Sequence, residues 1–386
     1  MSTTLVTAIS VYTIKIPSTG TIKQTNWSIE SVAVFPFSYY YSERGTDNLL
    51  VELRNRLPEI HYVDIRTYWQ PDASNPDNLT FSGGPIGYMG EYTHSISELE
   101  IMINKTRANG LDIMLWACKD PGVPAPNPQN WSVWFDNYAE YIKGIAEWAE
   151  SKKIPLFVFG AEYEAFMGDS LNALLGSGYT NEWNHVISEI RSVYSGKIIY
   201  GINWWSTAGQ WDVIYNQATW LASLDFIQID SYQSLGKNLY DRINATEIAK
   251  CWNPTIQDLM GNWTSNRYGP NFNYPNLYQA LSDKYDKKII INVGFRNNNG
   301  TSTMPWKNVP NVDLSGNPVP GWGADTAEMS DCWEAFFLTW ANNTSIIGLD
   351  LEHYSQPDTN GLNGSFRGKY DPVRQIGVWE VIEKYL

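Results

Sequence analysis

Residues 131–162 read WSVWFDNYAEYIKGIAEWAESKKIPLFVFGAE, and this stretch decides the fold. Its first part, Trp131–Ser151, carries apolar residues at helical spacing, which predicts an amphipathic helix. Its last part, Leu156–Gly160, is a short apolar run, which predicts a strand covered on both faces. Only the tight connection Ser151–Pro155 separates them. A helix that leads by a short connection into a buried strand is typical of α/β folds.

The same alternation recurs along the whole chain. Seven more strands are predicted, at Ser31–Phe37, Tyr62–Tyr68, Asp112–Trp116, Ile198–Ile202, Phe226–Ile229, Ile289–Val293 and Ile347–Leu351. Further amphipathic helices are predicted at Ser97–Asn109, Asn181–Tyr194 and Asp325–Trp340. Eight β/α alternations predict a parallel (β/α)8 TIM barrel. Because no composition break marks a second domain, we expect residues 1–386 to form a single TIM-barrel domain, with 1–30 as an N-terminal extension.

Loop lengths indicate which end of the barrel is functional. Helix-to-strand connections such as Asn109-Gly110 are tight, whereas strand-to-helix connections are long. These long connections predict rim insertions at about 70–95, 233–276, 297–324 and 355–371. In a barrel they emerge at the C-terminal ends of the strands, where active sites of this fold are built. Their Asn, Gly, Pro, Tyr and Trp residues are expected to wall a groove.

The amino-acid composition limits the classes of binding partner that are expected. The 386 residues carry a net charge of −14, which argues against binding a nucleic-acid backbone. Only 18% of residues are charged, while 14% are aromatic, including 18 Trp and 24 Tyr. Aromatic faces suit the flat C–H faces of sugar rings, although a large aromatic core explains the same composition. No uninterrupted apolar run is long enough for a membrane span, so no membrane insertion is expected.

The sequence contains no motif for a metal site or a cofactor site. The cysteines at 118, 251 and 332 form neither a zinc pattern nor an even disulfide set, and no metal or cofactor is expected. Ten N-x-S/T sequons are compatible with glycosylation, and the low charge suits a protein outside the cytosol. The first thirty residues lack the pattern of a standard signal peptide. The expected location is therefore extracellular or on the surface of a particle such as a virion. The sequence does not give the oligomeric state.

Carboxylates follow several of the predicted strands. Glu162 directly follows the strand Leu156–Gly160, where an unpaired buried charge would be costly. Asp230 ends the sixth strand, and alternation puts Asp350 and Glu352 on one face of the eighth. Carboxylates that converge with aromatics at a barrel mouth are typical of glycoside hydrolase sites, where two carboxyls flank the glycosidic oxygen. A structural hydrogen-bond network beneath the rim is the alternative, and for Asp350 it is preferred.

The order of these features resembles glycoside hydrolase family 113, retaining enzymes of the β-mannanase type on a (β/α)8 barrel. The resemblance spans roughly residues 30–386. It rests on five segments in order, and the ending 364–386 also fits. The segments are Ser97–Trp116 (SELEIMINKTRANGLDIMLW), Trp131–Glu162, Trp183–Trp205 (WNHVISEIRSVYSGKIIYGINWW), Asp225–Tyr232 (DFIQIDSY) and Ile289–Arg296 (IIINVGFR).

The resemblance implies roles for single positions. Glu162 falls on the family's acid/base Glu, whereas Asn292 stands where the family pattern Thr-Glu-Ile-Gly-Tyr-Arg has its nucleophile Glu. The strand-eight Trp of the family is also absent, with Leu351 or Glu352 in its place. Asn203, Trp204, Tyr232 and Arg296 also match positions of the family pattern and are expected to bind substrate. Independently of the resemblance, the same role is expected for Trp69, Trp116, Glu164 and Tyr354.

Three hypotheses follow from an Asn at position 292. An amide is a far poorer nucleophile than a carboxylate, so the first hypothesis is a barrel that recognises an oligo- or polysaccharide in its groove and has lost retaining hydrolysis. In the second, Glu352 or Asp230 replaces the missing carboxylate, and the chain hydrolyses a β-mannan-like or other β-glycan. In the third, Asn292 assists the substrate's own N-acetyl group. The rim loops that select the sugar differ most from the family, so the substrate itself transfers poorly.

Overall fold

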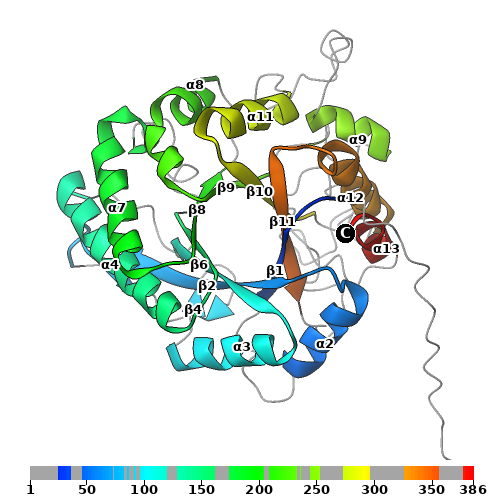
Figure 1. Ribbon diagram of the computed structural model, residues 1–386, viewed down its shortest axis with the longest axis horizontal. Helices are drawn as coiled ribbons and strands as arrows, with labels where there is room; N and C mark the ends of the chain where they lie inside the picture. The colour runs from blue at the N-terminus through cyan, green and yellow to red at the C-terminus, as the bar shows by residue number, and fades with distance from the viewer. Residues whose placement is uncertain are drawn as a thin grey trace, which may run out of the picture.

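The computed structural model is a closed barrel of eight parallel strands surrounded by helices (Figure 1), which confirms the predicted TIM barrel. It describes residues 25–35, 46–72, 74–81, 85–86, 91–92, 96–119, 128–160, 174–203, 208–232, 235, 244–252, 273–295, 326–355 and 377–386. The strands are β1 Ile29–Phe35, β2 Tyr62–Pro71, β6 Asp112–Lys119, β7 Leu156–Phe159, β8 Lys197–Asn203, β9 Phe226–Asp230, β10 Lys288–Val293 and β11 Ile346–Ser355. They pair in this order, and β1 closes the barrel by pairing with both β11 and β2.

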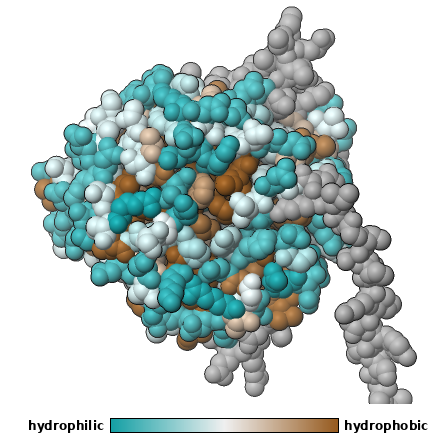
Figure 2. Space-filling view, viewed as in Figure 1, coloured by the Kyte–Doolittle hydropathy of each residue, from teal (hydrophilic) through white to brown (hydrophobic). Residues whose placement is uncertain are grey.

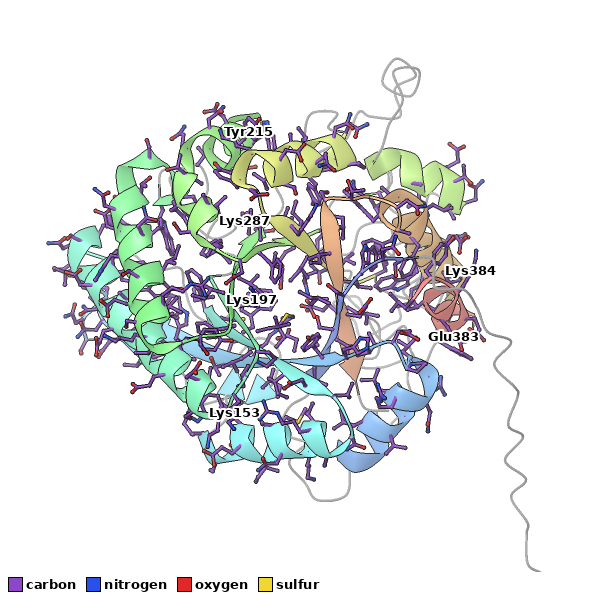
Figure 3. The ribbon with its side chains drawn as sticks, in the orientation of Figure 1. Lys153, Lys197, Tyr215, Lys287, Glu383 and Lys384 are labelled. Carbon is purple, nitrogen blue, oxygen red and sulfur yellow. The ribbon has the colours of Figure 1, made fainter. Side chains whose placement is uncertain are left out.

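Helices follow most strands and form the outer ring. They are α2 Thr46–Arg56, α3 Ile96–Ala108, α4 Trp131–Ser151, α7 Thr180–Val193, α8 Ala208–Asp212, α9 Ala245–Trp252, α11 Tyr274–Tyr285, α12 Thr326–Trp340 and α13 Val378–Tyr385. Short turns of other helix types lie at η1 Ser177–Tyr179, η2 Val213–Gln217 and η3 Thr219–Ser223. Lys153 and Lys287, labelled in Figure 3, lie in two of the helix-to-strand connections, and Lys197 begins β8.

Helix α4 shows how the local sequence builds the ring. The side chain of Asn130 accepts hydrogen bonds from the backbone N–H groups of Ser132 and Val133, which caps the helix start. The apolar stripe of α4 then packs inward, and its residues Trp134 and Tyr138 stack with ring centroids 5.0 Å apart. The helix has the bounds that the apolar spacing predicts.

The apolar core has two layers. Side chains that point into the barrel form one cluster, made of Ile29, Tyr68, Met114, Trp116, Cys118, Leu156, Val158, Ile199 and Ile290. A larger cluster fills the space between the barrel and the helices, and it holds most of the buried aromatic side chains, including Trp134, Trp183, Trp220, Trp333 and Trp340. In Figure 2 the surface is apolar near the centre of the ring and largely hydrophilic around it. Much of the aromatic content in the described part of the chain therefore serves the core.

One rim insertion is partly described. Strand β2 extends beyond the barrel and pairs antiparallel with β3 Leu79–Phe81, and β4 Pro85–Ile86 pairs with β5 Glu91–Tyr92. Asp77, in the turn before β3, accepts hydrogen bonds through Oδ1 from the backbone N–H groups of Gln129 (2.6 Å) and Asn130 (3.1 Å). These bonds tie the first rim insertion to the start of α4. The insertions expected at 297–324 and 233–276 lie outside the described residues, apart from 235, 244–252 and 273–276, and so does most of 355–371.

Candidate active site

Five polar residues lie side by side on five neighbouring strands, at the ends of β8, β9 and β10 and in the middle of β11 and β1. The strand register pairs Asn203 with Asp230, Asp230 with Asn292, Asn292 with Asp350, and Asp350 with Ser31. We call these five residues the polar row. Each is at most 4% exposed. Buried polar groups are costly unless they are hydrogen-bonded, so a row of this length on an apolar barrel marks a special site.

Hydrogen bonds connect three members of the polar row. The Ser31 hydroxyl donates to Asp350 Oδ1 at 2.8 Å. The Asn292 amide nitrogen donates to Asp350 Oδ2 at 2.8 Å and lies 3.4 Å from the Asp350 carbonyl oxygen. Both carboxylate oxygens of Asp350 are thus engaged within the barrel, and this carboxylate cannot reach a ligand in the groove.

Glu352 lies two residues beyond Asp350 and is the accessible carboxylate of the cluster. Its Oε2 accepts hydrogen bonds from the Tyr232 hydroxyl at 2.8 Å and from Arg66 Nη2 at 3.2 Å. The Tyr232 hydroxyl also lies 3.3 Å from Asn292 Oδ1. The Glu352 side chain is 23% exposed, whereas that of Asp64 is fully buried. Glu352 therefore presents a fixed carboxylate to the mouth of the barrel.

Arg66 joins two carboxyl groups. Its Nε donates to Asp64 Oδ2 at 2.8 Å while its Nη2 reaches Glu352. The guanidinium carbon lies 4.5 Å from the ring centroid of Trp116, whose indole N–H donates to the Gly160 carbonyl at 2.9 Å. A planar guanidinium can stack on an aromatic ring and donate from several edges at once. Trp116 thus acts as a platform under Arg66.

The ionisable groups of the cluster have differently shifted pKa values. Burial raises the pKa of Asp64 to about 8, although the Arg66 charge acts in the opposite direction. Burial raises the pKa of Asp350 to about 6, against the lowering effects of Arg66, Ser31 and Asn292. Burial alone would lower the pKa of Arg66, but the Glu352 and Asp64 carboxyls outweigh it and hold that pKa well above its ordinary value. At neutral pH, Asp64 holds its proton and Arg66 stays charged opposite Glu352.

Comparison with protein families decides the identity. The family model described as Glycoside Hydrolase Family 113 matches residues 79–319, which is more than half of the chain. The chain belongs to glycoside hydrolase family 113. A search of curated protein sequences gives no significant match.

Solved structures of the same family share the barrel. A structure of a GH113 β-1,4-mannanase in a complex matches with a TM-score of 0.61 at 18% identity, covering 92% of this chain and 98% of that one. The GH113 β-mannanase of Alicyclobacillus acidocaldarius matches with a TM-score of 0.59 at 14% identity, covering 92% and 96% of the two chains. At such identities the likeness shows a shared fold, and this family-113 barrel must be interpreted from its own residues.

The structure brings several of the expected site residues together. Tyr232 contacts both Asn292 and Glu352. Asp230 lies beside Asn292 in the polar row, and Asn203 lies beside Asp230. Asp230 is only 3% exposed, so it is less accessible than Glu352 as a replacement carboxylate.

Trp69 is placed elsewhere. Its side chain is fully buried between the barrel and α4, where it contacts Trp134 and Tyr138, so it does not face the groove as expected. Side chains alternate along a strand, and because Arg66 and Tyr68 point into the barrel, Trp69 must point outward. Tyr68 and Trp69 are adjacent in the strand, so their side chains lie on opposite faces of the sheet.

Other expected residues lie outside the described part of the chain. These are Glu162, Glu164, Trp204 and Arg296; the side chain of Tyr354 belongs with them, although its backbone lies in β11.

Asp64, Arg66 and Ser31 were not expected at the site. The available signal was the sequence Asp64-Ile65-Arg66 inside an otherwise apolar strand, since charged residues at alternate positions point to the same face. Among the described residues, no cluster of His, Cys, Asp and Glu has metal-binding geometry. In the same part of the chain, no helix combines the length and apolarity needed to cross a membrane.

Proposed function

We propose that this family-113 barrel hydrolyses a β-linked glycan, with Glu352 as the carboxylate that attacks or activates at the anomeric carbon and Glu162 as the acid/base. The observation that carries the proposal is the pair of hydrogen bonds that Glu352 Oε2 accepts from Tyr232 (2.8 Å) and Arg66 (3.2 Å). A nucleophilic carboxylate must be ionised, oriented and accessible. The Arg66 charge favours the anion, Tyr232 orients it, and partial exposure gives it access.

The contact with Tyr232 links Glu352 to the position that the resemblance assigns to the missing nucleophile. One hydroxyl reaches both Asn292 Oδ1 and Glu352 Oε2, so the two side chains end around the same point in space. A carboxylate that enters from strand β11 can therefore serve where the family pattern has one on the strand before it. This geometry supports the relocated-carboxylate hypothesis over a role for the buried Asp230.

The substrate-assisted hypothesis loses support from the hydrogen bonds of Asn292. Its amide nitrogen is directed at the Asp350 carboxylate (2.8 Å) and carbonyl (3.4 Å). The amide nitrogen is thereby directed into the barrel. An amide that orients a substrate N-acetyl group would need to direct a donor to the groove.

The chemistry of the proposed reaction has two forms. If Glu352 attacks, its oxygen bonds to the anomeric carbon, the glycosidic bond breaks, and the leaving oxygen takes the proton of Glu162; water then cleaves the ester with retention. If Glu352 instead deprotonates a water, the configuration inverts, which requires carboxyls about 6.5–9.5 Å apart. The anomer released first, followed by NMR, distinguishes the two forms.

The first substrate to test is β-mannan, because the similar GH113 structures are those of β-mannanases. Other β-glycans and a chitin-type polymer complete the screen. Turnover should require both Glu162 and Glu352, so Glu162→Gln and Glu352→Gln should each lower kcat by about a thousandfold or more. Glu383→Gln is the matched control, because Glu383 lies on α13 in the outer ring (Figure 3).

Position 292 provides the sharper test. Asn292→Glu alone should reduce activity, because it places a further carboxyl between Asp350 and Glu352. Combined with Glu352→Gln, the same change moves the carboxylate back to β10 and should recover activity relative to Glu352→Gln alone.

Binding without hydrolysis is the second candidate function, and the Asn at position 292 favours it. In that case the wild type would bind mannan oligosaccharides without cleaving any polymer in the screen, and Asn292→Glu alone would gain activity. That pair of results would overturn the proposed hydrolysis.

A further inference from the structure

Asp350 lies one layer below Glu352 on the same strand, and its contacts lead back to Glu352. Its side chain is fully buried. A carboxylate and a carbonyl only accept hydrogen bonds, so the Asn292 group facing them must be the amide nitrogen. The orientation of the Asn292 amide is therefore fixed by Asp350, and Asn292 Oδ1 faces the Tyr232 hydroxyl at 3.3 Å.

Among the described residues, the Tyr232 hydroxyl consequently has two acceptors for its one hydrogen. Glu352 Oε2, at 2.8 Å, is the nearer and charged acceptor, and Asn292 Oδ1, at 3.3 Å, is the more distant and neutral one. Hydrogen bonds to an ionised acceptor are the stronger. While Glu352 is anionic, the hydroxyl donates mainly to it.

We infer that Asp350 is a positioning residue for the attack by Glu352, because it fixes Asn292 as a second acceptor to which the Tyr232 hydroxyl turns as the carboxylate loses its charge. The inference rests on the proposed hydrolytic function. During attack, an electron pair of Glu352 forms the bond to the anomeric carbon, and the leaving oxygen takes its proton from Glu162. Tyr232 keeps its own proton throughout and only changes the direction in which it donates.

This arrangement addresses a general problem of nucleophilic catalysis. A donor that holds the nucleophile stabilises its ground state more than its transition state, which slows attack. A second acceptor at a fixed position lets the donor keep a hydrogen bond as the first acceptor becomes neutral. Without it, attack should slow by about tenfold, which corresponds to one ordinary hydrogen bond.

Two substitutions at Asp350 separate the hydrogen bond from the charge. Asp350→Asn and Asp350→Leu both remove the negative charge. The amide introduced by Asp350→Asn can still accept from Asn292, and it can donate to Ser31, whose hydroxyl can turn to the Leu349 carbonyl 3.4 Å away. The side chain introduced by Asp350→Leu can do neither.

Kinetics give the first readout. Asp350→Leu should have a kcat about tenfold below that of Asp350→Asn with similar KM values, because position 350 does not contact substrate. Equal kcat values in the two folded variants would overturn the inference and leave the proposed function standing, provided that Glu352→Gln is inactive.

A titration gives a readout that needs no turnover. The carboxyl signal of Glu352 is followed by NMR in protein labelled at the glutamate side-chain carboxyls, and it is assigned by its absence in Glu352→Gln. In Asp350→Leu the released Asn292 amide can turn its nitrogen toward Tyr232, so the hydroxyl donates wholly to Glu352. The titration midpoint should then lie about half a pH unit or more below that of Asp350→Asn. Equal midpoints would refute the coupling, whereas failure of the proposed function would appear separately, as a wild type without turnover.

Discussion

Arg66 is the residue on which the charged cluster depends. It is the cation that contacts both Asp64 and Glu352, and its side chain is only 11% exposed. Removing one partner of a buried ion pair leaves an uncompensated charge, which is more costly than the pair is stabilising. The stability of the site should therefore be most sensitive at Arg66.

Arg66→Met should lower the free energy of unfolding by about 3 kcal/mol at pH 7, because Glu352 loses its cation while Asp64 loses its donor. Arg66→Lys should give an intermediate loss, since one ammonium group cannot reproduce the planar fork. Urea unfolding followed by Trp fluorescence measures both. The control is Arg56→Met on α2, where the half-buried i,i+4 pair with Glu52 and the contact with the Trp379 ring together contribute about 1 kcal/mol or less. Similar losses at both positions would contradict the assigned role.

Gln228 lies in the barrel interior below the polar row, and its two amide atoms are buried without a hydrogen-bond partner in the described part of the chain. An unsatisfied buried amide costs about 1–3 kcal/mol. Gln228→Met keeps the length of the side chain and removes both polar atoms, so it should raise the free energy of unfolding by about 1 kcal/mol. A decrease in the same urea experiment would instead indicate an internal water bound by this amide.

Individual site residues could be predicted from the sequence, but their contacts with one another could not. The candidate Glu352 was visible because it alternates with Asp350 on an apolar strand, but its contacts with Tyr232 and Arg66 join residues 120 and 286 positions apart. Such long-range contacts depend on barrel closure, which no local pattern specifies. Trp69, by contrast, was wrongly predicted to bind substrate, since its aromatic side chain fits a sugar-binding surface and a core position equally well.

At the scale of elements, a glycine in a barrel strand allows the neighbouring strand to pack closely against it. A Cβ atom at Gly348 in β11 would lie 2.2 Å from the Ile29 carbonyl oxygen of β1. That contact is with backbone and lies at the β1–β11 seam, so it can be relieved only by moving a strand of the closed barrel. A Cβ at Gly144, on the outer surface of α4, would meet nothing within 4 Å.

The two glycines should therefore respond in opposite directions to the same substitution. Gly348→Ala should lower the free energy of unfolding by about 2 kcal/mol or more, because overpacking forces backbone shifts. Gly144→Ala should raise it by about 0.5–1 kcal/mol through helix propensity. Thermal unfolding of the two variants gives the comparison, and a destabilising Gly144→Ala or a neutral Gly348→Ala would be inconsistent with the described packing.

The elements themselves followed from hydrophobic periodicity. All eight barrel strands were predicted in place, and α4 was predicted with its observed bounds. The predicted ends of β2, β6 and β11 were too early. Strand β11 continues from Leu351 to Ser355 because Tyr354 and Ser355 still pair with Val34 and Phe35 of β1. Backbone pairing extends a strand into polar residues, where an apolar pattern cannot detect it.

At the scale of the whole molecule, the buried carboxyls make stability depend on pH. The pKa of Asp64 is raised to about 8 and that of Asp350 to about 6, in both cases mainly by burial. With an ordinary aspartate pKa near 4 in the unfolded chain, the folded protein binds more protons than the unfolded one between about pH 4 and pH 8. The free energy of unfolding should therefore decrease as the pH rises through this window.

Carboxyls with lowered pKa values act in a different range. Hydrogen bonds and ion pairs with Arg191 and Lys197 outweigh burial and lower the pKa of Asp225, while hydrogen bonds from Asn216 and Gln217 lower that of Asp212. Their stabilisation is present above their ordinary pKa and is lost only as the pH falls below about 4. Stability should therefore be greatest near pH 4–5, between the two effects.

Asp64→Asn tests this dependence directly. The neutral amide keeps an oxygen to accept from Arg66 and cannot ionise, so the decrease in unfolding free energy between pH 5 and pH 8 should become smaller by an amount on the order of a few kcal/mol. Asp225→Asn, at the surface pair with Arg191, should leave the slope in that range unchanged and alter only the acid side. Urea unfolding at pH 5, 6, 7 and 8 measures the slope for the wild type and both variants. An Asp64→Asn slope equal to that of the wild type would mean that Asp64 ionises in the folded barrel as easily as in the unfolded chain, and that Arg66 fully compensates its burial.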